Sequence, residues 1–387
     1  MDFSLSEMQK MLRSEARSFF EKECPSKLVR EMEESERGYP DELWRRMVDS
    51  GWMALPFPEE YGGVGGSFLD LLVLIEEMGR ACCPSPFIST VVLGGYTLLK
   101  LGSEKQKKGL IPEIAGGNST CTLALLETSD SYDIDKVECP AVFEKAAYSI
   151  KGTKLFVPYA HVADYILVVA KVNQTNKGNT VGVFIVDRKT SGLKNTLLKT
   201  IDGNKLCEVQ LDVKVLADCL VGDFDDIKNR LINVLEKATI AKCAEMVGGA
   251  QRVLEMTIEY AKERKQFGRP IGSYQAIQHH CANIAIDVEA SRLNTYHAAW
   301  LLSEGLPASK HVAVAKAWTS EAYRRVVTLG HEIHGAIGFT KEMDVELYVR
   351  RAKTAEIAFG DYDFHRNRLA MELASLISRE YNIALVV

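Results

Sequence analysis

The chain has 387 residues, of which 47% are hydrophobic and 26% are charged, and its formal net charge is −5. This length predicts two or three domains, and the composition is that of an ordinary globular protein. An acidic balance gives no field that would attract nucleic acid or an anionic membrane surface, so we expect neither partner. No apolar run approaches the ~18 residues of a membrane span, and the amphipathic start lacks the apolar core of a signal peptide.

The nine cysteines are odd in number and scattered in spacing, and no Cys-x-x-Cys pair occurs. This pattern argues against a zinc site and against a thioredoxin-type redox motif. Thiols without a disulfide framework are typical of a reducing compartment. We therefore expect a cytoplasmic protein with no bound metal.

The spacing of apolar residues divides the first 225 residues into two regions. Residues 1–118 carry apolar side chains at helical spacing, as in EMQKMLRSEARSFFEK and SFLDLLVLIEEMGRA. Residues 119–225 contain short segments rich in Val, Ile, Thr and Tyr, several of them bounded by Gly, Asn or Asp. The first pattern predicts an all-α domain, and the second predicts an antiparallel β domain.

Residues 226–387 return to helical spacing, now over stretches of some thirty positions. Helices of that length bury one face in a bundle or against another subunit. We therefore predict an α+β chain made of an N-terminal all-α domain, a middle antiparallel β domain and a C-terminal four-helix bundle.

Sequence motifs in a fixed order resemble the acyl-CoA dehydrogenase family. The most specific stretch is YAKERKQFGRPIGSYQAIQHH, in which a charged helix end is followed by Phe-Gly, a Pro-Ile-Gly turn and a new helix. Three more motifs agree in order along the chain: PEEYGGVGG with IEEMGRA, then HGAIGFTKE, then YVRRAKTAEIAFG. The resemblance covers essentially the whole chain and implies the same three-part fold.

The resemblance implies that the chain binds FAD. An anionic pyrophosphate needs fixed cations and backbone N–H groups, which Arg264 and a glycine turn containing Gly335 and Gly338 would supply. In the family these two elements come from neighbouring subunits. The implied cofactor-binding residues are Arg264, Phe267, Gln275, Glu332, Gly335, Gly338, His365 and Thr128. The structural alternative is that Arg264 caps a helix and that the glycines only end one.

Several positions depart from the family pattern. Glu332 stands where the family has Gln, and an acid beside a pyrophosphate is unfavourable unless it faces a hydroxyl or a cation. The flavin loop of the β domain is reduced to LETSDSYD, in which Glu127, Thr128 and Ser131 remain. Pro158 replaces a threonine of the flavin-flanking strand and cannot donate a backbone hydrogen bond.

The family's catalytic base is missing from both of its usual positions. Family chemistry removes the α-proton of an acyl thioester with a carboxylate held in a dry pocket. The usual Glu of a Glu-Gly-Thr motif corresponds to Phe359, and the alternative position on an earlier helix corresponds to about Ala238. Neither side chain can accept a proton.

Three carboxylates are candidate substitutes. Asp361 lies two residues beyond Phe359, where we expect Phe359 and Tyr362 to bury it, and Asp363 follows. Glu245 lies seven residues past Ala238 and so on roughly the same helical face. Each has a structural alternative: Asp361 as a helix cap, Asp363 as a solvated first-turn acid, and Glu245 as a packed bundle residue.

Three functions remain open. The first is an FAD-dependent acyl-CoA dehydrogenase acting on a bulky or cyclic acyl-CoA, as a homotetramer that passes electrons to an electron-transfer flavoprotein. The second is a base-lacking subunit of a heterotetramer with a related chain. The third is a relative that performs other flavin or thioester chemistry.

Overall fold

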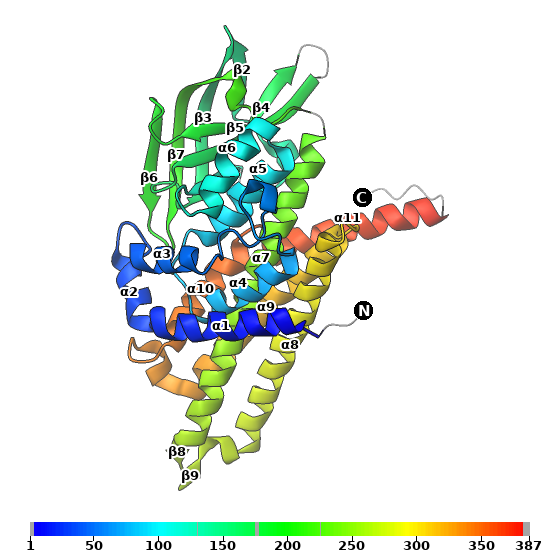
Figure 1. Ribbon diagram of the computed structural model, residues 1–387. Helices are drawn as coiled ribbons and strands as arrows, with labels where there is room; N and C mark the ends of the chain where they lie inside the picture. Colours follow the sequence, from blue (N-terminus) through cyan, green and yellow to red (C-terminus); the bar gives the residue numbers. More distant parts are fainter. Residues whose placement is uncertain (1–3, 130, 175–177, 225, 382–387) are drawn as a thin grey trace. The chain divides into compact units, whose positions relative to one another are not determined.

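The computed structural model describes residues 4–129, 131–174, 178–224 and 226–381. Helices come first, strands follow, and long helices end the chain, so the predicted class of an N-terminal helical domain, a middle β domain and a C-terminal helical domain is confirmed (Figure 1). The N-terminal helices are α1 (Glu7–Glu23), α2 (Ser26–Glu34), α3 (Asp41–Asp49), α4 (Phe68–Arg80), the π-helix η2 (Ile88–Gly95), α5 (Tyr96–Leu101) and α6 (Glu104–Ala115).

Local sequence explains where two of these helices begin. The hydroxyl of Ser6 accepts a hydrogen bond from the N–H of Gln9, and the Gln9 side chain accepts one from the N–H of Ser6. Ser103 and Gln106 form the same reciprocal pair before α6. Each capping box satisfies backbone donors that the first turn of a helix otherwise leaves unpaired.

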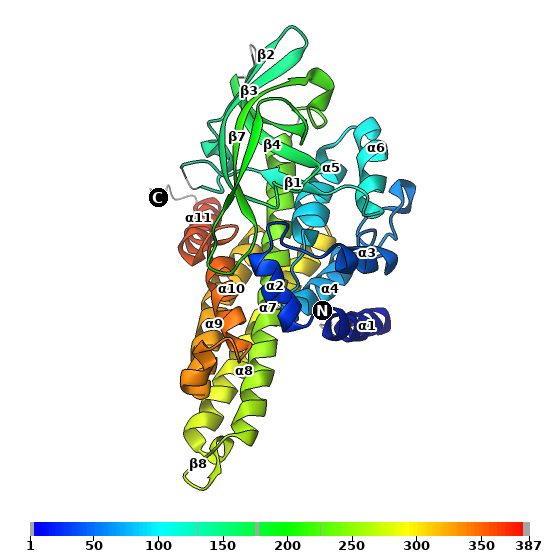
Figure 2. The same cartoon turned by 90° about the vertical axis from the view of Figure 1, so that its left-hand side faces the viewer.

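The β domain is a twisted sheet with the strand order β1-β4-β2-β3-β7-β6, and β5 pairs with β4 (Figure 2). Buried side chains alternate along β7, as period-two patterning requires. Most strand pairs are antiparallel, as predicted, but β1 and β2 both run parallel to β4. The strands are β1 (Cys121–Ala124), β2 (Pro140–Glu144), β3 (Ala147–Pro158), β4 (Tyr165–Gln174), β5 (Gly178–Asp187), β6 (Leu193–Leu198) and β7 (Leu206–Leu216).

The C-terminal helices pack mainly around α9. Helix α8 lies against it, and both α10 and α11 contact it. A short hairpin of β8 (Lys265–Gln266) and β9 (Arg269–Pro270) joins the first two helices. The helices are α7 (Ile227–Glu263), α8 (Gln275–Ser303), α9 (Ser309–His334), α10 (Val345–Ile357) and α11 (Tyr362–Tyr381).

Two acids of the IEEMGRA motif hold α1 and α8 to α4. The buried Glu76 carboxylate accepts hydrogen bonds from Arg292 at 3.1 Å and from the Tyr296 hydroxyl at 2.8 Å. Its neighbour Glu77 binds the Arg17 guanidinium at 2.8 and 3.0 Å. Close packing accompanies these pairs, since a Cβ at Gly248 of α7 would overlap the carbonyl oxygen of Glu76.

Packing divides the chain into two compact units that interleave along the sequence. One comprises residues 1–29, 68–83 and 239–387, and the other comprises residues 30–67 and 84–238. Helix α7 begins in the second unit and ends in the first. Among the described residues, no helix is both long enough and apolar enough to cross a membrane.

Candidate active site

The turn between α10 and α11 occupies the position where the family's base was expected. Phe359 has φ +60° and Gly360 has φ +94°, so two successive residues are left-handed. A non-glycine residue in this region costs about 1–3 kcal/mol and persists only when its surroundings fix it. Glycine is required at 360 for a second reason, because a Cβ there would overlap the Phe364 ring. The Phe-Gly pair is therefore fitted to an unusual turn.

The carboxylates proposed as substitute bases have structural roles or exposed positions. Asp361 is exposed rather than buried, and its carboxylate accepts the N–H of Phe364 at 2.9 Å. It is thus the N-cap of α11, which explains why it stays at the surface. Asp363 is exposed in the first turn of α11. Glu245 forms an ion pair with Lys242 one turn earlier in α7, and no hydrogen bond joins it to the turn within the described chain. Ala238 is fully buried.

His365 supports the turn from the inner side. Its ring is 1% exposed, and Nε2 hydrogen-bonds the carbonyl oxygen of Phe359 at 2.9 Å. Burial lowers the pKa of His365 to about 4, so the ring is neutral near pH 7 and Nε2 carries the donated proton. Its Nδ1 has no partner among the described residues, so contact with a cofactor would have to use that buried atom.

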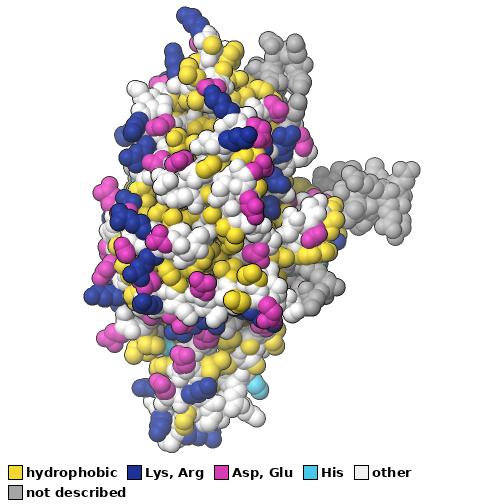
Figure 3. Space-filling view, in the orientation of Figure 1, with side chains coloured by type: hydrophobic (Ala, Val, Ile, Leu, Met, Phe, Trp, Pro, Cys, Tyr) yellow, Lys and Arg dark blue, Asp and Glu magenta, His cyan; other side chains and the backbone are white. Residues whose placement is uncertain are grey.

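The arginine-phenylalanine motif forms a tight hairpin. Phe267 (φ +52°) and Gly268 (φ +83°) are the two tip residues between β8 and β9, as in a type I′ turn. Phe267 is 94% exposed. Arg264 is exposed as well, and its backbone N–H and C=O are bonded to Tyr260 and Ile271. Dark-blue Lys and Arg side chains gather around this hairpin at the lower end of the space-filling view (Figure 3).

The exposed guanidinium makes no hydrogen bond within the described chain, so it is available to an anion. Gln275, at the start of α8, is also exposed. The structural alternative also has support, because the backbone N–H of Arg264 bonds the Tyr260 carbonyl oxygen at 2.8 Å and so caps the end of α7. That bond uses main chain and does not occupy the guanidinium.

The glycine turn follows the end of α9. Gly335 has φ +64° and ψ −147°, and its N–H bonds the carbonyls of Glu332 and His331. Gly335 therefore ends the helix and, having no Cβ, leaves the backbone open. Gly338 is buried, and a Cβ there would lie 3.1 Å from His334. Glu332 is exposed on the last turn of α9. No described hydrogen bond joins this turn to the hairpin.

The remnants of the flavin loop are partly used for internal structure. Buried Glu127 binds the Lys154 ammonium at 2.6 Å and the N–H groups of Glu138 and Cys139 at 2.9 and 3.0 Å. Burial acts to raise the Glu127 pKa, but Lys154 and the two N–H groups lower it overall. Thr128, the next residue, is exposed. Of the two neighbours, only Thr128 is free to face a ligand.

The strand that would flank a flavin contains a bulge. The pairing of β3 with β7 shifts between Lys154 and Val157, and Phe156 there has φ +53° and is 46% exposed. The carbonyl oxygen of Pro158 accepts the Thr122 hydroxyl at 2.7 Å. The bulge therefore turns the Phe156 side chain outward.

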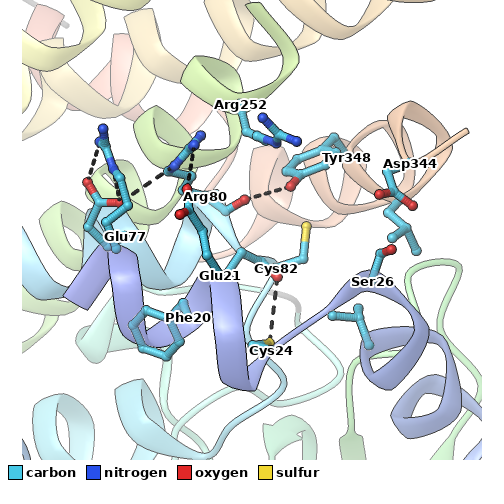
Figure 4. A pocket seen from close by; sticks show the side chains of 14 residues that line it. Phe20, Glu21, Cys24, Ser26, Glu77, Arg80, Cys82, Arg252, Asp344 and Tyr348 are labelled. Atoms are coloured by element: carbon cyan, nitrogen blue, oxygen red, sulfur yellow. Dashed lines mark hydrogen bonds and ion pairs between the residues drawn. The ribbon is translucent and has the colours of Figure 1, made fainter. Parts of the chain in front are cut away.

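A cavity of about 240 Å³ lies among α1, α4, α7 and α10, and Figure 4 shows its charged lining. Its arginines already have acidic partners: Arg17 binds Glu77, and Arg80 binds Glu21 at 3.2 Å and Glu255. The Tyr348 hydroxyl donates to the Arg80 carbonyl at 2.6 Å. A neutralised polar cavity of this size does not suit an acyl chain.

Comparison with known proteins decides the family. Residues 6–118, 122–213 and 229–374 match the acyl-CoA dehydrogenase N-terminal, middle and C-terminal domains, respectively. The chain belongs to the acyl-CoA dehydrogenase family. The family predicted from the sequence motifs is thus confirmed, and so is the expectation that the chain is an oxidoreductase of this family.

Individual relatives cover nearly the whole chain. A probable acyl-CoA dehydrogenase of Bacillus subtilis, YngJ, is 33% identical over 96% of this chain and 100% of its own. A chain of the ChsE4-ChsE5 complex of Mycobacterium tuberculosis superposes with a TM-score of 0.88 and is 31% identical, and the match covers 97% of this chain and 99% of that one. A variant of the Tcur3481-Tcur3483 steroid acyl-CoA dehydrogenase superposes with a TM-score of 0.87 and is 29% identical, and the match covers 97% of this chain and 100% of that one.

Sequence reasoning missed one residue of this region, Lys316. It lies on the buried face of α9 and is fully buried. Its signal in the sequence was a lone lysine among the small and apolar residues of HVAVAKAW. Charged side chains are rarely buried without a partner, so such a lysine indicates a specific acceptor.

Proposed function

We propose that this chain is an FAD-binding acyl-CoA dehydrogenase subunit whose assembly introduces a double bond into a bulky or cyclic acyl-CoA thioester. The observation that carries the proposal is the left-handed Phe359-Gly360 turn, which keeps a specific backbone shape although residue 359 cannot act as a base. The similarity to a steroid acyl-CoA dehydrogenase supports the substrate class.

Bound FAD would supply the two-electron oxidation of the Cα–Cβ bond. Arg264 would hold its pyrophosphate through charge-assisted hydrogen bonds, and the open backbone at Gly335 would let phosphate approach from a second chain. Phe267 would cover an aromatic surface of the same ligand. Gln275, Glu332, Gly338, His365 and Thr128 are further proposed contacts, with Glu332 directed to a hydroxyl group.

The acyl thioester would be held by main chain rather than by a side chain. The N–H at position 359 belongs to the left-handed turn and would donate to the thioester carbonyl oxygen, where negative charge develops as the α-proton leaves. The Phe359 side chain would line the pocket and help to exclude water. In this chain Asp361 is the first candidate proton acceptor, and Asp363 and Glu245 are the alternatives.

A second candidate function is that of a base-lacking subunit in a heteromeric enzyme. It is favoured by one observation: Asp361 caps α11 and Glu245 is paired with Lys242, so neither is held free for proton transfer. The similarity to a complex of two named chains, ChsE4 and ChsE5, agrees with this reading. In that case a related partner supplies the carboxylate, and this chain supplies part of the flavin site.

The proposed assembly is a tetramer, either of identical chains or with a related subunit, that passes electrons to an electron-transfer flavoprotein. All nine cysteines are free, which supports the proposal of a cytoplasmic location.

The test begins with the protein purified alone and records its visible spectrum and its flavin reduction by a panel of acyl-CoA thioesters. A flavin band with reduction by a cyclic or steroid-side-chain thioester supports the first function. A chain that gains flavin and activity only with a related subunit supports the second. No flavin and no thioester binding in either form would refute both.

A further inference from the structure

Lys316 ties helix α9 to both sides of the turn that carries Phe359. Its ammonium group donates to the carbonyl oxygen of Glu356 at 2.8 Å, to that of Gly360 at 2.9 Å and to the Ser320 hydroxyl at 3.0 Å. The three donors of the ammonium are thereby all used. Glu356 lies in the last turn of α10 and Gly360 lies just before α11, so one side chain spans the whole connection.

The same turn is held from a second direction by His365. Its Nε2 binds the carbonyl of Phe359, so three carbonyl oxygens between positions 356 and 360 are bound by buried side chains. Because a peptide unit is planar and its C=O and N–H point in opposite directions, anchoring the Gly360 carbonyl inward turns the N–H of Asp361 outward. The turn thus has an anchored inner side and an outer side to which the N–H of Asp361 points.

Burying the charged Lys316 side chain costs free energy, which suggests that the turn it holds has a function. Removing an ammonium group from water carries a large desolvation cost, and well-packed apolar residues often replace buried charges without loss of stability. Burial lowers the pKa of Lys316 to about 8, which reflects that cost. The groups around Lys316 are Cys243 and Lys242 of α7, Glu356 of α10 and Asp361.

A charged donor is suited to this position for an electrostatic reason as well. Hydrogen bonds from an ammonium group are stronger than those from neutral donors, and they polarise the peptide units that accept them. Each polarised peptide becomes a better N–H donor on its other side. Lys316 therefore fixes the geometry of the turn that holds the N–H of position 359, and it strengthens the outward N–H of Asp361.

We propose that Lys316 is a positioning residue for the acyl-CoA site: by binding the Glu356 and Gly360 carbonyls, it sets the left-handed Phe359-Gly360 turn to receive the thioester carbonyl. This inference rests on the proposed acyl-CoA function. It adds that the site is organised from within α9, by a side chain that does not touch the substrate.

The test compares Lys316→Met with Lys310→Met in the complete flavin-loaded assembly. Lys310 is an exposed lysine on the same helix, so its replacement controls for the loss of one positive charge. Hydrogen–deuterium exchange is followed at the amides of residues 358–361. We expect Lys316→Met to speed exchange there by at least about 10-fold, with the rest of α9 protected, and Lys310→Met to leave it unchanged.

Ser320→Ala provides a second control, because it removes one acceptor of Lys316 but neither carbonyl contact. It should leave exchange in the turn within about 2-fold of the parent. Should Lys316→Met fail to fold, Lys316→Arg takes its place; the longer fork cannot reproduce both carbonyl contacts, and turn exchange should rise by about 3-fold or more. Parent-like exchange in the folded Lys316 variant would overturn the inference.

Ligand binding separates this inference from the proposed function. Benzoyl-CoA, a thioester with no saturated α-carbon to lose a proton, is titrated against the flavin absorbance of the assembly. We expect about 10-fold weaker binding to Lys316→Met with unchanged FAD content, and parent-like binding to the two controls. Equal binding to parent and Lys316→Met would refute the positioning role. If the parent itself binds no thioester, the proposed function fails, and the positioning role fails with it even when exchange still follows Lys316.

Discussion

The ring of His365 donates a hydrogen bond to the carbonyl oxygen of Phe359, the residue that the sequence motifs align with the family's catalytic glutamate. The bond joins two residues within the FGDYDFH stretch, and it needs a proton on Nε2, which the buried neutral ring carries as its single N–H. The side chain proposed to contact the cofactor thus also holds the turn, through its Nε2.

Burial of this ring makes the folded protein sensitive to acid. The pKa of His365 is about 4 in the fold, below its ordinary value near 6.5, so the unfolded chain binds a proton at a pH where the folded chain does not. Its stabilising contribution is therefore complete above about pH 6.5 and is lost as the pH falls towards about 4, up to about 3 kcal/mol.

His365→Gln replaces the ring N–H with an amide N–H donor that does not titrate, so the stability of the variant should fall less on acidification. Between about pH 7.5 and about pH 5, urea unfolding should show the parent losing about 2 kcal/mol more than the variant. His279→Gln, at an exposed histidine of α8, is the control and should behave as the parent does. Identical pH slopes for His365→Gln and the parent would contradict the assignment.

The variant Asp361→Asn distinguishes a helix-capping role of Asp361 from a role as proton acceptor. Asparagine caps helices about as well as aspartate, so the thermal midpoint should stay close to that of the parent. If Asp361 accepts the α-proton, flavin reduction by acyl-CoA should fall by about 10²–10⁴-fold with FAD still bound. Parent-like reduction would leave Asp361 as a cap only.

Asp361→Ala completes that comparison. It removes the hydrogen bond to the N–H of Phe364 and should cost about 1 kcal/mol, which calorimetry measures directly. A stability loss in the alanine variant but not in the asparagine variant would establish the cap independently of any activity.

Arg264→Ala should weaken FAD binding. Loss of a charge-assisted contact costs roughly 1.5–3 kcal/mol, which is about 10- to 150-fold in affinity. FAD content after dialysis against limiting cofactor is the measurement, and Lys262→Ala, at an exposed lysine of the same helix end, is the control. FAD retention equal to that of the control would count against a phosphate contact at Arg264.

Gly248→Ala tests the contact between α4 and α7. A Cβ at this position would overlap the Glu76 carbonyl oxygen and lie 2.8 Å from the Arg80 backbone nitrogen, so we expect a loss of about 3 kcal/mol in unfolding free energy. Gly109→Ala is the matched control in α6, where nothing lies within 4 Å, and it should stabilise by about 0.5–1 kcal/mol. A neutral Gly248→Ala would show that the two helices can move apart.

The periodicity of the sequence predicted the order of helices and strands because burial period and element type are directly linked. It could not predict that β1 and β2 run parallel to β4, since strand direction depends on which segments meet across the sheet. The motifs predicted where site residues lie along the chain. They could not tell that Asp361 is exposed as a cap, or that the ring of His365 turns inward.

Lys316 was overlooked for a related reason. Its partners, the carbonyls of Glu356 and Gly360, are about forty residues away and are main-chain atoms, which carry no sequence signature. The role of Glu127 was also not predictable. Its motif suggested a loop that faces a ligand, and only the bond to Lys154 shows that the Glu127 side chain faces inward.

The exposed ring of Phe267 has a consequence for the amounts in which the cell must synthesise the chains of the assembly. If its hairpin completes a site on another chain, the number of complete sites depends on chain concentration and, for a mixed assembly, on the ratio of the two products. Dilution should then lower the activity per molecule, and an excess of one chain should leave hairpins without a partner. Matched synthesis of the two chains would be as much a requirement for activity as any side chain of the site.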